Sequence, residues 1–270
     1  MRARRATLPG LHSFTVTLPG VTGASRGLRP QQDAYGQILL AHLEGRSAHE
    51  IMERDDGFIY CGDPSEYFAP FRRWPAVERR AMRFVRGRVL DVGCGAGRVA
   101  LHLQARGHEV IAIDQSPLAV TVARRRGVKR TRVLPIADAD TALGVFDTVV
   151  LLRNNFGLAG PEERAPKLLR DLHAITAGSG RIVTDSVDPG RLEDPALRTG
   201  GNGVRYRVRW RTYASPWFRY LMLQRSELER LVSGTGWHVA RFLDDGSPRY
   251  VAILEKDRQL TRRAPRSEKA

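Results

Sequence analysis

The segment Val89-Leu90-Asp91-Val92-Gly93-Cys94-Gly95-Ala96-Gly97-Arg98 is a short apolar run followed at once by a glycine-rich turn. The apolar run predicts a strand buried on both faces, and residues 99–106 predict a helix that stops at a glycine. Glycines in such a turn let the backbone approach a ligand and adopt dihedral angles that a Cβ would forbid. The turn also presents amide groups at a helix N-terminus, which favours a ligand at the carboxyl edge of the sheet.

The alternation of strand and helix patterns extends outward from this turn over residues 87–183. Such alternation is typical of a parallel sheet covered by helices on both faces. Two further apolar runs around the turn at 244–248 predict an antiparallel hairpin at the edge of that sheet. The fold class is therefore α/β: a doubly wound, mostly parallel sheet with an antiparallel C-terminal edge hairpin. The expected strands are 88–92, 109–113, 132–135, 146–152, 181–184, 237–243 and 250–255.

The remaining segments predict a small cap, an insert and two basic tails. Residues 1–30 mix Gly, Pro, Ser, Thr and Arg without a sustained period, which predicts a disordered extension. Amphipathic patterns in 31–86 predict a helical cap. The connection 187–223 is too long for a simple loop, so we expect a lid or substrate-facing insert within the 87–255 domain. Residues 256–270 form the second expected disordered tail.

Composition narrows the class of protein. The chain has 270 residues and a formal net charge of +15, of which residues 1–30 and 256–270 carry +9. The remaining +6 is ordinary for a soluble core, so we expect a nucleic-acid partner to be improbable without excluding it. No apolar run reaches the ~18 residues that a membrane span needs. Two cysteines are too few for a disulfide framework, so we expect a cytoplasmic protein.

Acidic residues end three successive predicted strands: Asp91, Asp114 and Asp138. Asp91, at the head of the glycine turn, suits the amino-acid end of a ligand that carries an ammonium group. Asp114 follows Asp91 at close to the ~20-residue spacing at which a carboxylate meets a ribose diol. Asp138 could accept a hydrogen bond from an adenine amino group. Arg98 occupies the position where a dinucleotide-binding turn has its third glycine, which disfavours a pyrophosphate ligand.

At these residues the chain resembles the class I S-adenosylmethionine-dependent methyltransferases. Asp91 and the three turn glycines match the first motif of that family, Asp114 its ribose acid, and Asp138 its adenine contact, with Asp140 as an alternative. The specific resemblance covers about residues 88–152, and it implies a seven-stranded sheet with S-adenosylmethionine as cofactor. The candidate cofactor-binding residues are Asp91, Gly93, Cys94, Gly95, Gly97, Asp114, Gln115, Asp138, Ala139 and Asn154.

The sequence predicts no catalytic base and no metal site. Methyl transfer from a sulfonium mainly requires alignment of the acceptor and exclusion of water. The histidines are scattered, and no cluster has metal-ligand spacing. Asn155, Tyr213 and Trp217 are candidate substrate contacts. In 204–211 arginines alternate with apolar residues, which fits a solvated strand face better than an anion-binding surface.

The sequence leaves three functions open. The first is methylation of a small molecule, which the compact length and modest core charge favour. The second is methylation of RNA or protein, for which the basic tails could serve as tethers. The third is a Rossmann oxidoreductase that uses NAD, or a non-catalytic cofactor-binding protein, because the fold alone does not decide between them.

Overall fold

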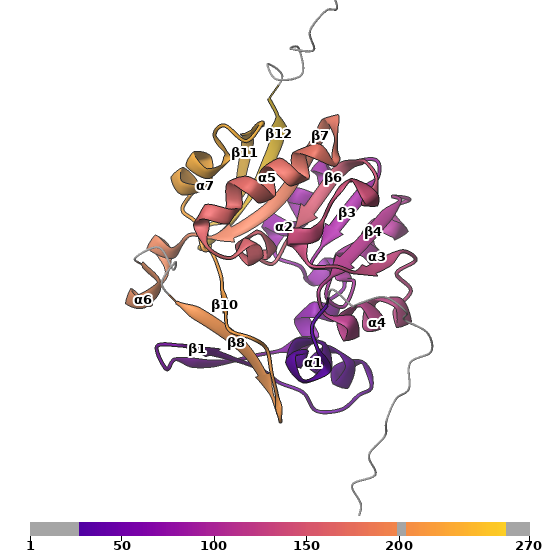
Figure 1. Cartoon of the computed structure of the whole chain (residues 1–270), viewed down its shortest axis with the longest axis vertical. Coiled ribbons are helices and arrows are strands. Elements are labelled where there is room, and N and C mark those ends of the chain that lie inside the picture. Colours follow the sequence, from indigo (N-terminus) through magenta and orange to yellow (C-terminus); the bar gives the residue numbers. More distant parts are fainter. Residues whose placement is uncertain (1–26, 199–203, 258–270) are drawn as a thin grey trace, which may run out of the picture.

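A seven-stranded sheet, here called the large sheet, forms the centre of the computed structural model, which describes residues 27–198 and 204–257 (Figure 1). The strand order is β11-β12-β7-β6-β3-β4-β5. All neighbouring pairs from β7 to β5 are parallel, while β12 is antiparallel to both β7 and β11. The predicted fold class and edge hairpin are therefore confirmed. The strands are β3 (Val89–Val92), β4 (Val110–Asp114), β5 (Thr131–Val133), β6 (Phe146–Leu151), β7 (Thr176–Val187), β11 (Trp237–Asp244) and β12 (Arg249–Lys256).

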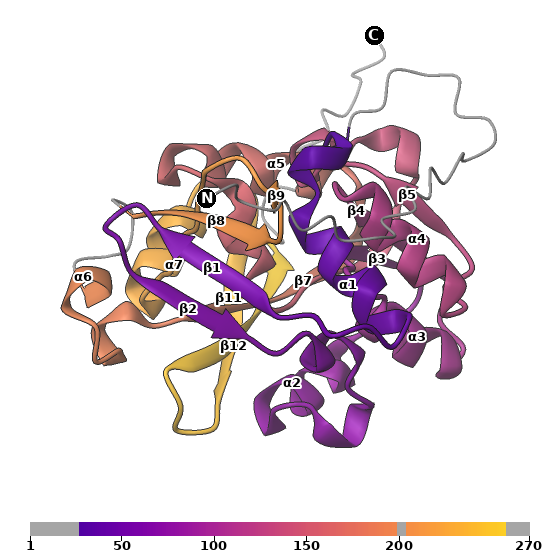
Figure 2. The same cartoon turned by 90° about the horizontal axis from the view of Figure 1, so that it is seen from below.

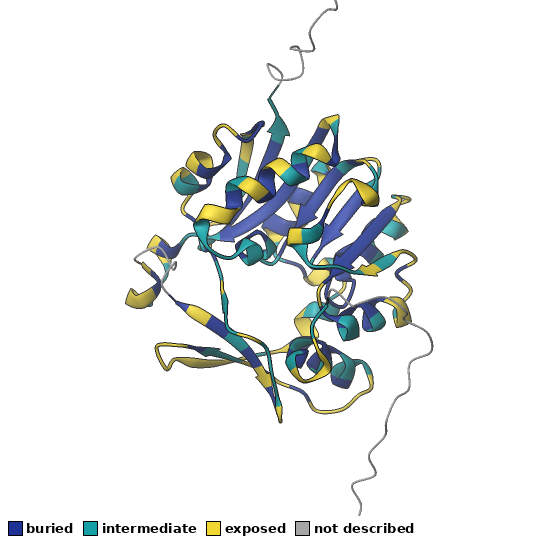
Figure 3. Cartoon of the chain, viewed as in Figure 1, coloured by how far each residue is buried: buried dark blue, intermediate teal, exposed yellow. Residues whose placement is uncertain are grey.

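Helices cover both faces of the large sheet, and the central strands β3, β4 and β6 are buried between them (Figure 3). Side chains of α5 and α7 share one apolar cluster with one face of the strands, and side chains of α2 and α3 share a second cluster with the opposite face. Alternation along each strand therefore supplies both clusters. The helices are α2 (Ala76–Ala81), α3 (Arg98–Ala105), α4 (Pro117–Arg125), α5 (Ala165–Ala174) and α7 (Arg225–Val232).

A second, antiparallel sheet lies across from the large sheet (Figures 1 and 2). We call it the small sheet; its strand order is β10-β8-β1-β2, with β9 paired to β8. Two of its strands come from the predicted cap and three from the predicted insert. The strands are β1 (Glu50–Arg54), β2 (Ile59–Gly62), β8 (Arg205–Trp210), β9 (Tyr213–Ala214) and β10 (Phe218–Arg219).

The prediction of a purely helical cap is wrong for residues 50–62. These residues form the β1–β2 hairpin, whose turn contains Asp56 and Gly57, the latter at φ +90°. An Asp-Gly pair between two strand-forming runs is a hairpin signal, and β8 supplies the partner that makes the hairpin stable. The other helical segments of this part are α1 (Ala34–Leu43), α6 (Pro195–Arg198) and the short 3-10 turns η1 (Pro30–Gln32), η2 (Pro64–Phe68), η3 (Phe71–Arg73) and η4 (Met82–Phe84). Further 3-10 turns are η5 (Ile136–Asp138), η6 (Thr141–Leu143), η7 (Asn155–Ala159), η8 (Glu162–Arg164) and η9 (Pro189–Arg191).

Asp33 fixes helix α1 against the start of α4. Its carboxylate accepts hydrogen bonds from the amide of Gly36, the hydroxyl of Ser116 at 2.6 Å and the amide of Leu118. Ser116 in turn caps α4 by accepting from the amide of Ala119. One buried carboxylate thus joins the N-termini of two helices, and the first turn of α1 is held beside the end of β4.

The arginine face of β8 points away from the interior and is paired with acids of the hairpin. Arg205 pairs with Asp55, and Arg207 and Arg209 both pair with Glu53. The opposite face of β8, with Tyr206, Val208 and Trp210, is buried. Strand alternation therefore places the charges at the surface, as expected for a solvated face.

The predicted tails fall largely outside the described residues. Of the predicted extension 1–30, only 27–30 are described, and of the predicted tail only 256 and 257. Lys256 is the last residue of β12, and its ammonium group donates to the carbonyls of His173 and Thr176. In the described part of the chain, no helix is both long and apolar enough to cross a membrane.

Candidate functional site

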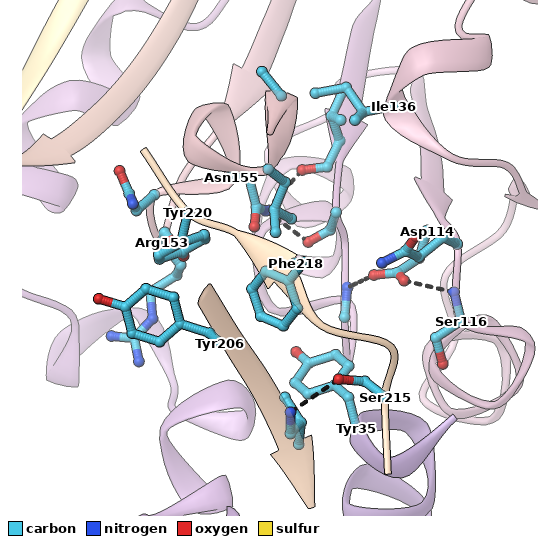
Figure 4. A pocket seen from close by; sticks show the side chains of 18 of the residues that line it. Tyr35, Asp114, Ser116, Ile136, Arg153, Asn155, Tyr206, Ser215, Phe218 and Tyr220 are labelled. Atoms are coloured by element: carbon cyan, nitrogen blue, oxygen red, sulfur yellow. Dashed lines mark hydrogen bonds between the residues drawn. The ribbon is translucent and has the colours of Figure 1, made fainter. Parts of the chain in front are cut away.

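A cavity of about 1160 Å³ lies between the carboxyl edge of the large sheet and the small sheet (Figure 4). Residues that follow β3, β4, β5 and β6 line one side of it, and side chains of β1, β2, β8 and β10 line the other. In Figure 4, Asp114, Asn155 and Ile136 come from the first side. Ligand pockets usually span roughly 300–1,000 Å³, so this cavity has room for two molecules.

The glycine turn has the backbone that its sequence predicts. Gly93, Gly95 and Gly97 have φ values of +69°, +51° and +80°, a region that L-residues with a Cβ rarely adopt. A Cβ on Gly93 would lie 2.4 Å from the side-chain nitrogen of Asn155, and one on Gly95 would lie 2.6 Å from the hydroxyl of Tyr35. Both positions therefore require glycine for two reasons, conformation and space.

Asp114 braces the glycine turn from the end of β4. One carboxylate oxygen accepts from the amide of Gly95 and the other from the amide of Ser116, both at 2.9 Å. Burial raises the pKa of Asp114 to about 6, although these two amides lower it. Each oxygen keeps a second lone pair, and Asp114 lines the cavity, so the carboxylate can still accept hydrogen bonds from a ligand.

Asp91 lines the same cavity from the end of β3. One of its oxygens accepts from the amide of Ala100 at 3.1 Å, which fixes the carboxylate against the first turn of α3. Burial raises the pKa of Asp91 to about 7. The residue therefore supports the turn structurally and also presents a carboxyl group to the cavity.

Two asparagines follow β6 and hold the loop after it. Arg153 and Asn154 have φ values of +68° and +59°, and the amide of Asn154 donates to the buried carboxylate of Asp185. The Asn154 side-chain nitrogen donates to a carbonyl, while its oxygen is buried without a hydrogen-bond partner among the described residues. The side-chain nitrogen of Asn155 donates to the carbonyls of Val92 and Gly93, which ties this loop to the glycine turn.

The cavity brings together most of the residues that the sequence selects. The sequence-selected residues that line it are Asp91, Gly93, Cys94, Gly95, Asp114, Gln115, Asn154, Asn155 and Trp217. Gly97 lies beneath the turn instead, where a Cβ would meet Val128 at 2.6 Å. Burial raises the pKa of the Cys94 thiol, which agrees with a packing role rather than a nucleophilic one.

Three other selected residues do not line the cavity. After β5 the chain turns through η5, so that Ile136 and Ala137 line the cavity, while Asp138 is half-buried outside the cavity lining and Ala139 is buried in the core. The alternative, Asp140, caps η6 through the amide of Ala142. Tyr213 pairs with Trp210 in the small sheet, their rings stacked 6.1 Å apart.

Several residues of the opposite wall are absent from the sequence prediction. Besides Trp217, Tyr67 and Tyr220, this wall contains a buried carboxylate and further aromatic side chains: Glu50, Tyr35, Tyr60, Tyr206 and Phe218. The Asp-Gly hairpin turn was the available signal for β1 and β2, and the alternation in 204–211 for β8. Nothing in the sequence paired these two segments with each other, so their common wall could not be derived.

The two buried aspartates predict how stability depends on pH. The ordinary pKa of an aspartate is 3.8. At pH values between 3.8 and the raised pKa values of Asp91 and Asp114, the folded chain holds protons that the unfolded chain has released. This stabilisation is complete below the ordinary value and is lost as the pH rises through the raised values. We expect the free energy of unfolding without ligand to fall between about pH 4 and about pH 7, by up to about 1.4 kcal/mol per pH unit for Asp91.

Urea unfolding of the wild type and of Asp91→Asn across this range measures the effect. The difference between the two proteins gives the contribution of Asp91 alone to the pH dependence. Other groups contribute too, such as His102, whose lowered pKa makes the free energy of unfolding rise with pH instead of fall. The variant should show the flatter pH dependence. Parallel curves for the two proteins would contradict the assigned protonation of Asp91.

Most of the known proteins to which this chain is similar are named as methyltransferases. A family described as "Methyltransferase domain" matches residues 89–180. The chain is 32% identical over 128 residues to a demethylmenaquinone methyltransferase of Thermus thermophilus, covering 45% of this chain and 53% of that protein. It is 30% identical over 146 residues to a tRNA (uracil(54)-C(5))-methyltransferase of Pyrococcus horikoshii, covering 52% of this chain and 33% of that protein. The chain thus spans about half the length of these curated relatives, or less.

A solved structure matches most of the chain. It is a SAM-dependent methyltransferase from Bacteroides fragilis in complex with S-adenosyl-L-homocysteine, 27% identical in sequence with a TM-score of 0.76. The superposition covers 85% of this chain and 97% of that one. The likeness therefore extends beyond the 89–180 domain to the parts that form the opposite wall.

Proposed function

The chain carries the methyltransferase domain of the class I S-adenosylmethionine-dependent family, and from this premise we propose that it transfers a methyl group from S-adenosylmethionine to a small-molecule acceptor. One observation carries the proposal. The glycine turn and the aromatic wall of the small sheet line the same cavity. A donor held at the first would therefore face an acceptor held at the second.

The large-sheet side of the cavity has the groups that this cofactor requires. The glycine turn presents backbone without side chains to the cavity at Gly93 and Gly95, and Asp114 can accept from two ribose hydroxyls. Ile136 and Ala137 offer an apolar surface for a purine ring, and Asp91 a carboxyl group near the amino-acid end. S-adenosylmethionine supplies a methyl group on a sulfonium, so the chain itself needs mainly to align the acceptor and keep water out.

The small-sheet side favours a small acceptor over a macromolecule. Its lining is largely aromatic and aliphatic, and ligand pockets of that composition suit compact organic molecules. Arg207 and Arg209 of β8 lie on the other face and are ion-paired with Glu53, while Arg205, which reaches the cavity lining, is ion-paired with Asp55. The second candidate function is methylation of RNA or protein, and one relative is named as a tRNA methyltransferase. In that case the positive charge of residues 1–30 and 256–270 would tether the macromolecular acceptor.

Calorimetry against three ligands tests these candidates. We expect S-adenosylhomocysteine to bind with a dissociation constant on the order of micromolar, and NAD not to bind. A short mixed-sequence RNA should not bind at low salt, where phosphate contacts are strongest. Tight NAD binding without S-adenosylhomocysteine binding would overturn the assignment. RNA binding that disappears when both tails are removed would favour the macromolecular acceptor instead.

A further inference from the structure

Glu50, the first residue of β1, is a buried carboxylate in the wall of the cavity. Its side chain is 8% exposed, and one oxygen accepts from the hydroxyl of Tyr67 at 2.8 Å. The ladder partner of Glu50 in β2 is Gly62, where even a Cβ would lie 2.9 Å from that oxygen. The missing side chain at Gly62 therefore leaves the space that the carboxylate occupies.

Glu50 has fewer compensating partners than three other carboxylates at or near the cavity. Asp114 accepts from two amides, Glu66 pairs with Arg153, and Asp185 pairs with Arg249. Glu50 has the Tyr67 hydroxyl and, in the described part of the chain, no ion pair. An ionised carboxylate in such a place is costly unless another donor reaches it, and burial accordingly raises its pKa.

Aromatic rings line the cavity in which Glu50 lies. The rings of Tyr35 and Tyr67 meet edge to face with centroids 5.2 Å apart. The rings of Tyr206, Phe218 and Tyr220 form a second group, with centroids 6.0 to 6.2 Å apart (Figure 4). Aromatic walls of this kind favour a planar ring by stacking or edge contacts.

Glu50 also lies at the border with the cofactor side. The Tyr35 hydroxyl approaches the glycine turn at Gly95, and the Tyr35 ring contacts Tyr67, whose hydroxyl donates to Glu50. Two adjoining rings thus connect the carboxylate to the turn. A planar acceptor beside them would have its polar edge at Glu50 and the turn within reach.

We propose that Glu50 binds the nucleophilic O–H or N–H of a planar aromatic acceptor and takes its proton during methyl transfer, an inference that rests on the proposed function. The acceptor oxygen or nitrogen forms a bond to the methyl carbon, and the sulfonium–carbon bond breaks with its electron pair left on sulfur. The acceptor's proton passes to the Glu50 carboxylate, which becomes neutral. General bases of this kind contribute about 10²–10⁴-fold to the rate.

The test uses naphthol, hydroxyindole and hydroxyquinoline as probes, each with its methyl ether as the control that lacks the proton. Calorimetry measures their binding to the protein saturated with S-adenosylhomocysteine, and S-adenosylhomocysteine release from S-adenosylmethionine measures methylation. We expect at least one hydroxyl probe to bind about 10-fold more tightly than its ether. Glu50→Gln should remove that preference and lower methylation about 100-fold.

Two variants separate this role from a structural one. Glu53→Gln makes the same change on the same strand, at a residue paired with arginines outside the cavity, and should change neither readout. Tyr67→Phe removes the hydroxyl partner of Glu50 but leaves the carboxylate, so it should preserve the preference for the hydroxyl probe. If Glu50 only holds Tyr67 in place, Tyr67→Phe and Glu50→Gln will have the same effect, which overturns the proposal.

The outcomes distinguish a failure of the proposed function from a failure of the proposal for Glu50 and its acceptor. Failure of the wild type to bind S-adenosylhomocysteine would overturn the proposed function. Normal S-adenosylhomocysteine binding with no probe bound would overturn the acceptor class alone. Probe binding and methylation that Glu50→Gln leaves unchanged would overturn the role of Glu50.

Discussion

Replacing Asp114 with alanine is expected to weaken S-adenosylhomocysteine binding about 100-fold, with little residual affinity for S-adenosylmethionine. The variant loses two kinds of interaction at once. It removes the acceptor proposed for the ribose hydroxyls, and hydrogen bonds to a charged group contribute about 1.5–3 kcal/mol. It also frees the amides of Gly95 and Ser116 that the carboxylate now holds at 2.9 Å. The dissociation constant from calorimetry measures the loss.

Asp138→Ala is the matched control for this experiment. It removes an aspartate near the end of the neighbouring strand, but one that is half-buried and does not line the cavity. We expect its dissociation constant to stay within about 2-fold of the wild type, as for ordinary surface substitutions. Equal losses in both variants would contradict the ribose role of Asp114 and restore the adenine role that the sequence suggests for Asp138.

The second large effect is expected from Gly93→Ala. An alanine at φ +69° costs about 1–3 kcal/mol of stability, because L-residues rarely adopt this conformation. The new Cβ would also lie 2.4 Å from the side-chain nitrogen of Asn155, which ties the next loop to the carbonyls of Val92 and Gly93. We expect loss of detectable S-adenosylhomocysteine binding together with a lower midpoint of urea unfolding.

Gly107→Ala separates backbone strain from the effect on the site. Gly107 has φ +86°, and a Cβ there would meet no atom within 4 Å. This variant should lose similar stability through the backbone but keep its affinity for S-adenosylhomocysteine. If Gly93→Ala binds as tightly as Gly107→Ala, the glycine turn does not hold the cofactor.

The cofactor side could be predicted from sequence because its information is local. The glycine turn and Asp114 each follow a strand directly, and parallel strands bring their carboxyl ends to one edge. Even there, Asp138 shows the limit of spacing arguments. Three residues shortly after β5, Ile136–Asp138, form a 3-10 turn whose direction decides which side chain faces the cavity, and that direction depends on packing of Ile136 and Ala139 rather than on the acid itself.

The opposite wall could not be predicted because its information is not local. Hairpin residue Ile51 pairs with Arg209, and the Asp55 carboxylate accepts from the amide of Arg205, 150 residues later in the chain. Pattern analysis finds candidate strands but not their partners. The residues proposed to recognise the acceptor, Glu50 above all, therefore became visible only in the folded chain.

The distance in sequence between the β1–β2 hairpin and its partner strand β8 has a consequence for synthesis on the ribosome. At roughly 5–20 residues per second, about 8–30 s pass between the emergence of the β1–β2 hairpin and that of its partner β8. An isolated hairpin is marginally stable, and this one carries Phe58 and Ile59, which remain 52% and 61% exposed even in the finished fold. The nascent chain must therefore carry an unpaired strand edge while β3 to β7 of the large sheet emerge, a period in which chaperone binding or association between growing chains competes with folding.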